Sequence, residues 1–134
     1  MNHIDQAEKL LLMASKDMKA MELMMSPESI DDEIYGFHAQ QAVEKSLKAW
    51  ISVIGGTYSF THDLWVLLMT LQELGCDIVK FKHLIMLSPF AAQLLYEPLE
   101  TVDEPLDRPA LRTQIQELHD HVQSAVALIK AGVA

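Results

Sequence analysis

A segment near residue 40 gathers polar side chains that could bind an anion. At about 100° per residue, four of them share an arc of about 80° on one helix face. These are His38, Gln41, Lys45 and Lys48. Lysine supplies point charge to phosphate oxygens, while glutamine and histidine supply oriented hydrogen bonds. This polar ribbon predicts a nucleotide- or phosphate-binding face. The alternative is a solvated face in which Glu44 and acids elsewhere neutralise both amines through ordinary salt bridges.

Two pairs of residues that contain histidine raise the question of a metal site. His62-Asp63 is a metal-binding pair in some enzymes, but no matching set of further His and Asp ligands follows it at helical positions. We therefore expect Thr61 to cap a helix with Asp63 in its first turn. His119 and His121 point about 160° apart on a helix and cannot share a metal. The sequence predicts no metal site and no cofactor, and it has no glycine-rich phosphate loop.

Apolar residues repeat at steps of three and four along most of the chain, which is typical of amphipathic helices. The pattern predicts helices over 4–25, 31–54, 64–74, 78–96 and 109–129. Pro89 lies inside the fourth helix, where we expect a kink or a break. Residues 97–109 are rich in acids and proline and are expected to form a loop. Because no segment alternates like a strand, the predicted fold class is all-α. The expected architecture is an antiparallel bundle of four to five helices in a single domain, 1–134.

Composition narrows the possible partners and compartment. The 134 residues carry 19 acids and 10 bases, a net charge of −9. General phosphate neutralisation on duplex DNA is therefore excluded, although local basic patches are not. No apolar run approaches the ~18 residues that a membrane span needs. Cys76 is the single cysteine, so no intramolecular disulfide can form, which fits a reducing, cytoplasmic location.

Two motifs resemble those of a known family. Residues 37–49 read Phe-His-Ala-Gln-Gln-Ala-Val-Glu-Lys-Ser-Leu-Lys-Ala. This run resembles the signature helix of the HEPN domain, whose pattern is Phe-His-x-Gln-Gln-x-x-Glu-Lys-x-x-Lys-Ala. Residues 61–64, Thr-His-Asp-Leu, resemble the segment that follows that helix in the family. The spacing, the helix order and the total length agree as well.

The resemblance implies a HEPN-like helical bundle that forms a homodimer and is linked to nucleotides or RNA. Small members are often encoded beside a minimal nucleotidyltransferase, as two-component or toxin–antitoxin pairs. We therefore expect a nucleotide- or RNA-associated accessory protein that partners a nucleotidyltransferase. The positions that match the two motifs are His38, Gln41, Glu44, Lys45, Lys48, His62 and Asp63. Among them, His62 joins the polar ribbon as an expected phosphate-binding residue.

Two further functions remain open. Ribonuclease members of the family use an arginine, four to six residues, and then a histidine. Arg112 and His119 have this spacing, and seven steps on a helix bring the two side chains within about 20° of one another. They could act as the catalytic pair of a metal-independent endoribonuclease, with Arg112 stabilising the charge of a phosphorane and His119 moving the 2′-hydroxyl proton. The third function is a non-catalytic helical module that only holds a partner protein.

Overall fold

The computed structural model describes residues 2–91 and 105–132. Within those ranges the chain forms four α-helices and one 3₁₀ helix and contains no strand. The elements are α1 (His3–Leu23), α2 (Asp32–Val53), α3 (Leu64–Glu73), η1 (Val79–Leu87) and α5 (Arg108–Lys130). The prediction of an all-α fold is confirmed.

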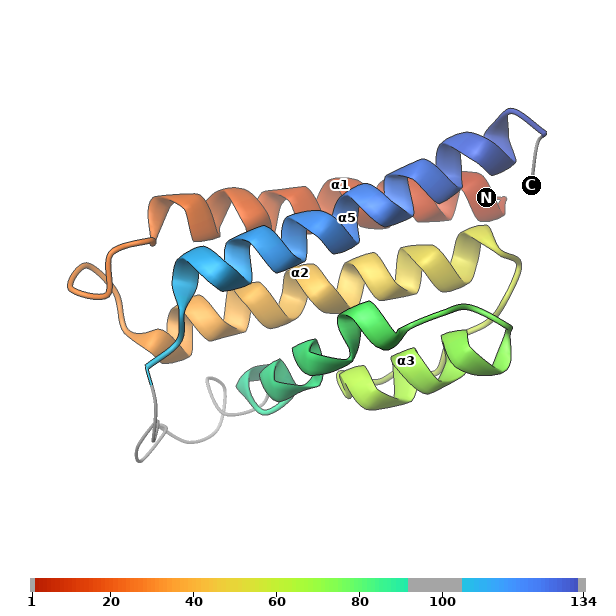
Figure 1. Cartoon of the computed structure of the whole chain (residues 1–134). Helices are drawn as coiled ribbons and strands as arrows, with labels where there is room; N and C mark the ends of the chain where they lie inside the picture. Colours follow the sequence, from red (N-terminus) through yellow and green to blue (C-terminus); the bar gives the residue numbers. More distant parts are fainter. Residues whose placement is uncertain (1, 92–104, 133–134) are drawn as a thin grey trace.

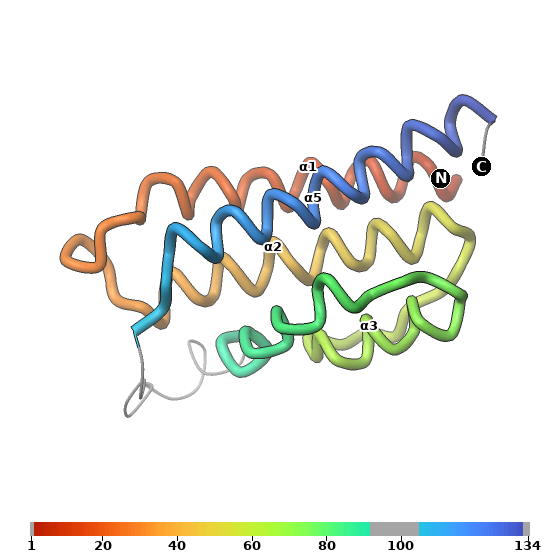
Figure 2. The backbone as a smooth tube through the Cα atoms, viewed as in Figure 1, coloured from red at the N-terminus to blue at the C-terminus, as the bar shows by residue number. Residues whose placement is uncertain are grey.

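The three long helices form the body of the molecule. Helices α1, α2 and α5 run side by side and pack against each other pairwise (Figure 1). Helix α1 runs antiparallel to α2 and α5, which run parallel to each other, so the ends of the chain lie close together (Figure 2). The shorter α3 and η1 form a second layer against α2. Helix α2 is therefore covered on several sides, which makes its polar residues unusually buried.

Three helices begin at the residue types that favour helix starts. The side chain of Asn2 accepts a hydrogen bond from the Asp5 amide at 2.8 Å. The side chain of Asp107 accepts one from the Ala110 amide at 3.0 Å, with Pro109 in the first turn of α5. For α3 the expected cap is wrong, because the structure places Asp63 in that role.

At the start of α3, the Asp63 side chain accepts a hydrogen bond from the Trp65 amide at 3.0 Å. The hydroxyl of Thr61 accepts one from the Asp63 amide instead, also at 3.0 Å. Thr61 thus shapes the turn that leads into the cap. A carboxylate at the N-cap also carries the charge that the helix dipole favours, which explains why Asp63 takes the position.

The fourth predicted helix differs in type and length. Residues 79–87 form a 3₁₀ helix, although the sequence predicts an α-helix over 78–96. Four large apolar residues fall at intervals of three and are buried: Ile78, Phe81, Leu84 and Leu87. A 3₁₀ helix has three residues per turn, so this spacing keeps all four on one face.

The break expected at Pro89 is confirmed. The chain turns at Ser88 and Pro89 and becomes helical again at Phe90 and Ala91. The rest of the predicted fourth helix and most of the predicted 97–109 loop lie outside the described residues.

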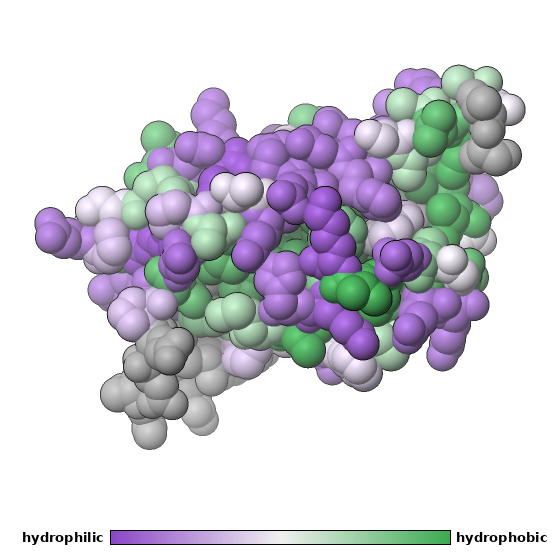
Figure 3. All heavy atoms as spheres, in the orientation of Figure 1, coloured by the Kyte–Doolittle hydropathy of each residue, from purple (hydrophilic) through white to green (hydrophobic). Residues whose placement is uncertain are grey.

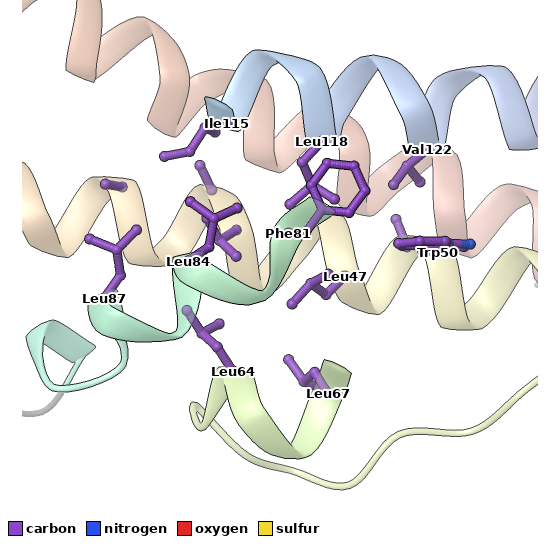
Figure 4. Close-up of a cluster of buried hydrophobic side chains, with 14 of the residues drawn as sticks. Leu47, Trp50, Leu64, Leu67, Phe81, Leu84, Leu87, Ile115, Leu118 and Val122 are labelled. Atoms are coloured by element: carbon purple, nitrogen blue, oxygen red, sulfur yellow. The ribbon is translucent and has the colours of Figure 1, made fainter. Parts of the chain in front are cut away.

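The hydrophobic core joins both layers. Figure 4 shows Leu47 and Trp50 of α2 among side chains from α3, η1 and α5. All of these residues are buried, and they belong to one continuous cluster. Packing on this face fixes the rotation of α2 about its axis, and so it fixes where the polar ribbon points.

Candidate functional site

The first half of the polar ribbon is bonded to α1. Lys45 places its Nζ 2.7 Å from Oδ2 of Asp17, and the Nδ1 of His38 lies 3.0 Å from Oδ1 of the same carboxylate. The Asp17 side chain is only 11% exposed, and that of Lys45 is 20% exposed. One nearly buried carboxylate therefore holds two of the four ribbon residues.

The second half of the ribbon converges on Glu44, whose side chain is 6% exposed. Its Oε2 accepts a hydrogen bond from Lys48 Nζ at 3.0 Å. Its Oε1 lies 3.0 Å from the donating Nε2 of Gln40 and 2.8 Å from Nδ1 of His62. Burial raises the pKa of Glu44, but the three hydrogen bonds outweigh burial and hold the pKa below its usual value.

Gln41 extends this second network. Its Nε2 donates a hydrogen bond to Oε1 of Gln40 at 2.7 Å. Gln40 also donates to the backbone carbonyl of His62 at 3.0 Å. Four of the residues that match the two sequence motifs are thus joined by hydrogen bonds that fasten the loop before α3 onto α2: Gln41, Glu44, Lys48 and His62. His62 itself keeps most of its ring in solvent, with a side chain 70% exposed.

Both amines of the polar ribbon are paired in the structure. Lys45 and Lys48 each bind a buried carboxylate of their own chain, which is the alternative that the sequence left open. Binding a phosphate there requires leaving Asp17 or Glu44 buried without its cation. An unpaired buried charge is strongly unfavourable, so the geometry favours a structural role for these amines.

A different polar surface lies between α1 and α5. A groove of about 360 Å³ is lined by Ser15, Met18, Lys19, Glu22, Arg112, Gln116, His119 and Gln123. The structure therefore brings the two predicted catalytic residues to one groove. At 1.5 Å per residue, seven steps separate them by about 10 Å along α5.

Arg112 contacts two side chains, whereas His119 contacts the backbone. The Nε of Arg112 lies 2.7 Å from Oε1 of Glu22, whose side chain is 55% exposed, and Nη1 donates to Gln116 at 2.9 Å. His119 is buried and places Nε2 3.1 Å from the carbonyl oxygen of Leu11. A neutral His119 that donates through Nε2 has Nδ1 left as its basic nitrogen.

Arg108 is an important residue that the sequence reasoning missed. It is 1% exposed, and its guanidinium donates to the carbonyls of Met24, Ser26 and Ile30 at 2.6–3.0 Å. It also pairs with Asp32 at 2.9 Å. A cation in the first turn of a helix opposes the helix dipole, and this was the available signal that Arg108 has a special role.

Tyr35 completes the environment of Arg108. The guanidinium carbon of Arg108 lies 4.8 Å from the centre of the Tyr35 ring, and the Tyr35 hydroxyl donates to the Arg108 carbonyl at 3.0 Å. Burial raises the pKa of Tyr35 to about 12, against the opposing charge of Arg108. The contacts tie the start of α5 to the turn between α1 and α2.

The described residues contain no cluster of three or more His, Cys, Asp or Glu side chains that could hold a metal ion. None of the described helices is both long and apolar enough to cross a membrane.

Comparison with known families matches the HEPN domain to residues 7–130. The match covers nearly the whole chain, and the chain belongs to the HEPN family. No curated protein and no solved structure matches it significantly.

Proposed function

We propose that this HEPN protein is a cytoplasmic accessory subunit associated with RNA or a nucleotide. It works as a homodimer beside a minimal nucleotidyltransferase, in a two-component or toxin–antitoxin pair. Family membership and the two matched motifs support this role. A net charge of −9 also suits a complex in which a more basic partner contributes much of the phosphate contact.

The accessibility of the paired carboxylates favours the α1–α5 groove as the phosphate contact of this chain. Glu22, the partner of Arg112, is 55% exposed, whereas the partners of Lys45 and Lys48 are 11% and 6% exposed. Because the Glu22 carboxylate is largely exposed, it can return to solvent when a phosphate takes its place on Arg112, and no buried charge is left unpaired. Lys19 lines the same groove and adds a second cation.

Calorimetric titration tests this assignment. ATP and a short single-stranded RNA are titrated into the wild type, Arg112→Ala and the double variant Lys45→Ala/Lys48→Ala. We expect Arg112→Ala to weaken binding about tenfold, because a charge-assisted hydrogen bond is lost. The double variant, if circular dichroism shows it folded, should bind like the wild type.

The same titration tests the polar ribbon as the rival phosphate site. If the folded double variant loses binding while Arg112→Ala binds like the wild type, the phosphate-binding site is the polar ribbon instead. The ribbon consists of His38, Gln41, Lys45, Lys48 and His62. A wild type that binds neither ligand would contradict the association with RNA or nucleotide.

The partner is tested by co-expression with a nucleotidyltransferase encoded next to this chain. We expect the two proteins to co-purify at a fixed ratio. Co-purification without affinity for ATP or RNA would support the interaction module instead. Absence of a complex would contradict the accessory role.

An endoribonuclease is the second candidate, because Arg112 and His119 line one groove. His119 would take the proton of a 2′-hydroxyl, and the 2′-oxygen would bond to phosphorus. The bond from phosphorus to the 5′-oxygen would break, and that oxygen would leave with a proton taken from water. Arg112 would stabilise the charge on the phosphorane.

Cleavage of single-stranded RNA in EDTA tests this candidate. His119→Ala should lower the rate at least about 100-fold, as loss of a general base does. His121→Ala is the matched control, since its ring makes edge-to-face contacts with Trp50 and Phe81 on another side of α5. Equal rates for His119→Ala and the wild type would exclude the catalytic pair.

A further inference from the structure

The side of α1 that faces away from the core is both basic and apolar, in a chain that is acidic as a whole. At about 100° per residue, six exposed side chains of this helix share an arc of about 120°. We name them the α1 outer surface: Lys9, Leu12, Met13, Lys16, Lys19 and Leu23. Among its apolar members, Leu12 is 61% exposed and Leu23 is 79% exposed. In Figure 3, hydrophobic residues lie between hydrophilic ones along the upper edge of the molecule, where Figure 1 shows α1.

The three lysines of this surface make no ion pair with an acid of the described residues. The chain has ten basic residues, and six of them form such pairs. The other four are Lys9, Lys16, Lys19 and Lys82, so three of the four lie on α1. The exposed acids beside them, Glu8 and Glu22, are each bonded to a base of α5. Residues 9–21 carry three lysines and one aspartate, a net charge of +2, although the whole chain carries −9.

The apolar side chains of the α1 outer surface lie among the lysines and not on a separate side. Viewed down the helix axis, Leu12 and Leu23 project between the directions of Lys16 and Lys19. Leu12 also borders a cavity of about 430 Å³ between α1 and α5, and the lining of this cavity includes Leu11, Val126 and Ala127. A ligand that covers the lysines therefore also meets exposed aliphatic side chains and an apolar hollow beside them.

This combination indicates an acidic amphipathic helix as the occupant. Carboxylates complement the lysines, and the negative field of the rest of the chain disfavours contact of an acidic segment with other faces. Apolar residues of a helix laid along α1 would pack on Leu12, Met13 and Leu23. At 1.5 Å per residue, the three lysines are about 10 Å and about 5 Å apart along the axis, which matches acids seven and three residues apart on a partner helix.

Two other classes of ligand fit the α1 outer surface less well. The bases of single-stranded RNA stack on aromatic side chains, and none of the six residues is aromatic. An anionic membrane is recognised by clusters of about four to eight lysines or arginines. Here three lysines stand in a chain of net charge −9, which the same membrane repels.

We propose that the α1 outer surface binds an acidic amphipathic helix of a partner protein. Its lysines pair with the carboxylates of that helix, and its apolar side chains pack on the apolar residues between them. The proposal goes beyond the proposed function and does not depend on it, because Lys9 and Lys16 do not line the groove that contains Arg112. Lys19 does line that groove, so the variants that test the proposal leave Lys19 unchanged.

Fluorescence anisotropy with a designed peptide tests the surface. The probe is a labelled helical peptide of about 18 residues, which presents glutamates and leucines on one face in the spacing of the lysines and apolar residues of α1. Two matched peptides carry lysine in place of the glutamates or serine in place of the leucines. We expect the wild type to bind the first peptide at least about tenfold more tightly than either of the others. Its binding should weaken as salt rises from about 50 to about 500 mM.

Charge reversal on α1 gives the sharpest comparison. Lys9→Glu/Lys16→Glu should weaken binding of the acidic peptide at least about tenfold and should strengthen binding of the lysine peptide, because the charge complementarity is reversed. Lys80→Glu/Lys82→Glu is the matched control, since it makes the same change of charge at exposed positions of η1 and should stay within about twofold of the wild type.

Removal of the apolar side chains tests the second half of the recognition. Leu12→Ser/Leu23→Ser leaves the charge unchanged and should weaken binding of the acidic peptide about tenfold, because apolar contact area is lost. All of the substituted residues are exposed in the structure, so circular dichroism should show the helix content of the wild type in every variant.

Four results would overturn the proposal. The first two are a wild type that does not bind the acidic peptide and a wild type that binds all three peptides equally. The third is an equal loss of binding in Lys9→Glu/Lys16→Glu and in the control variant. The fourth is a loss of RNA or of phosphatidylglycerol vesicles in Lys9→Glu/Lys16→Glu while its peptide binding is unchanged. The proposed function is tested separately, since we expect Lys9→Glu/Lys16→Glu to bind ATP and RNA like the wild type.

Discussion

Asp17 on α1 and Lys45 on α2 form an ion pair of 2.7 Å in which both side chains are largely buried. The pair links two helices that are also joined by a turn, and it uses the cation that the sequence offered for phosphate. Replacing either residue leaves the other charge without its partner. The pair is therefore expected to contribute to stability more than an exposed ion pair does.

A double-mutant cycle measures this contribution. Urea unfolding of Asp17→Asn, Lys45→Met and the double variant should give a coupling energy of about 1–3 kcal/mol. The exposed pair of Glu8 and Lys130, 3.2 Å apart, is the control and should couple by less than about 1 kcal/mol. Equal coupling in the two cycles would contradict a special role for the buried pair.

Glu44 should make stability depend on acid pH. Its pKa is lowered in the folded state, so its contribution is present above the ordinary carboxyl pKa of 4.5 and is lost as pH falls through the lower folded pKa. Glu44→Gln should be less stable than the wild type by about 3 kcal/mol at pH 7, and the difference should shrink as pH falls below 4.5. Unfolding by urea from pH 7 to pH 3 measures both curves. A difference that stays constant with pH would rule out the hydrogen-bonded carboxylate as its cause.

Of the two arginines, Arg108 should contribute more to the free energy of unfolding. Arg108→Ala removes the donors of three backbone carbonyls and leaves Asp32 unpaired, so we expect a loss of about 3–5 kcal/mol in unfolding free energy. Arg108→Lys should restore little of this free energy, because a lysine ammonium cannot direct several hydrogen bonds in the fixed plane of a guanidinium. Arg112→Ala should cost clearly less than Arg108→Ala, because its partner Glu22 is 55% exposed and is not left as a buried unpaired charge. Similar losses for the two alanine variants would contradict this ranking.

Gly36 should tolerate no side chain. A Cβ atom at this position of α2 would lie 2.4–2.7 Å from the ring of Phe90, which is buried. Gly36→Ala is expected to lower the midpoint of thermal unfolding and to cost about 1–3 kcal/mol through overpacking. The double variant Gly36→Ala/Phe90→Leu should recover part of the loss. Gly36→Ala with wild-type stability would show that the ring moves aside freely.

The bundle could be predicted from local patterns in the sequence. The apolar steps from Ile4 to Met21 and the caps and prolines give the helices to within a few residues, because these signals act within one turn or two. The three-residue spacing of Ile78, Phe81, Leu84 and Leu87 is also typical of a 3₁₀ helix. The sequence nevertheless predicts an α-helix there, because apolar residues at i and i+3 fit both helix types over short distances.

The ion pairs that the polar ribbon makes could not be predicted from local patterns in the sequence. Spacing along α2 places Lys45 and Lys48 on one face correctly, but it does not show which carboxylate from another helix meets them. Asp17 is 28 residues away in the sequence, and only the packing of α1 on α2 brings it to Lys45. Arg108 is a stronger example, since its acceptors lie 76–84 residues away.

Those separations have a consequence during synthesis on the ribosome. Helices α1 and α2 leave the exit tunnel well before Arg108, so the carbonyls of Met24, Ser26 and Ile30 are hydrated when the first hairpin forms. The turn acquires its protein donors only when the last helix arrives and displaces that water. Folding of the turn between α1 and α2 is thus coupled to the C-terminal segment. In a nascent chain that stops before residue 108, the carbonyls of this turn lack their protein hydrogen-bond donors.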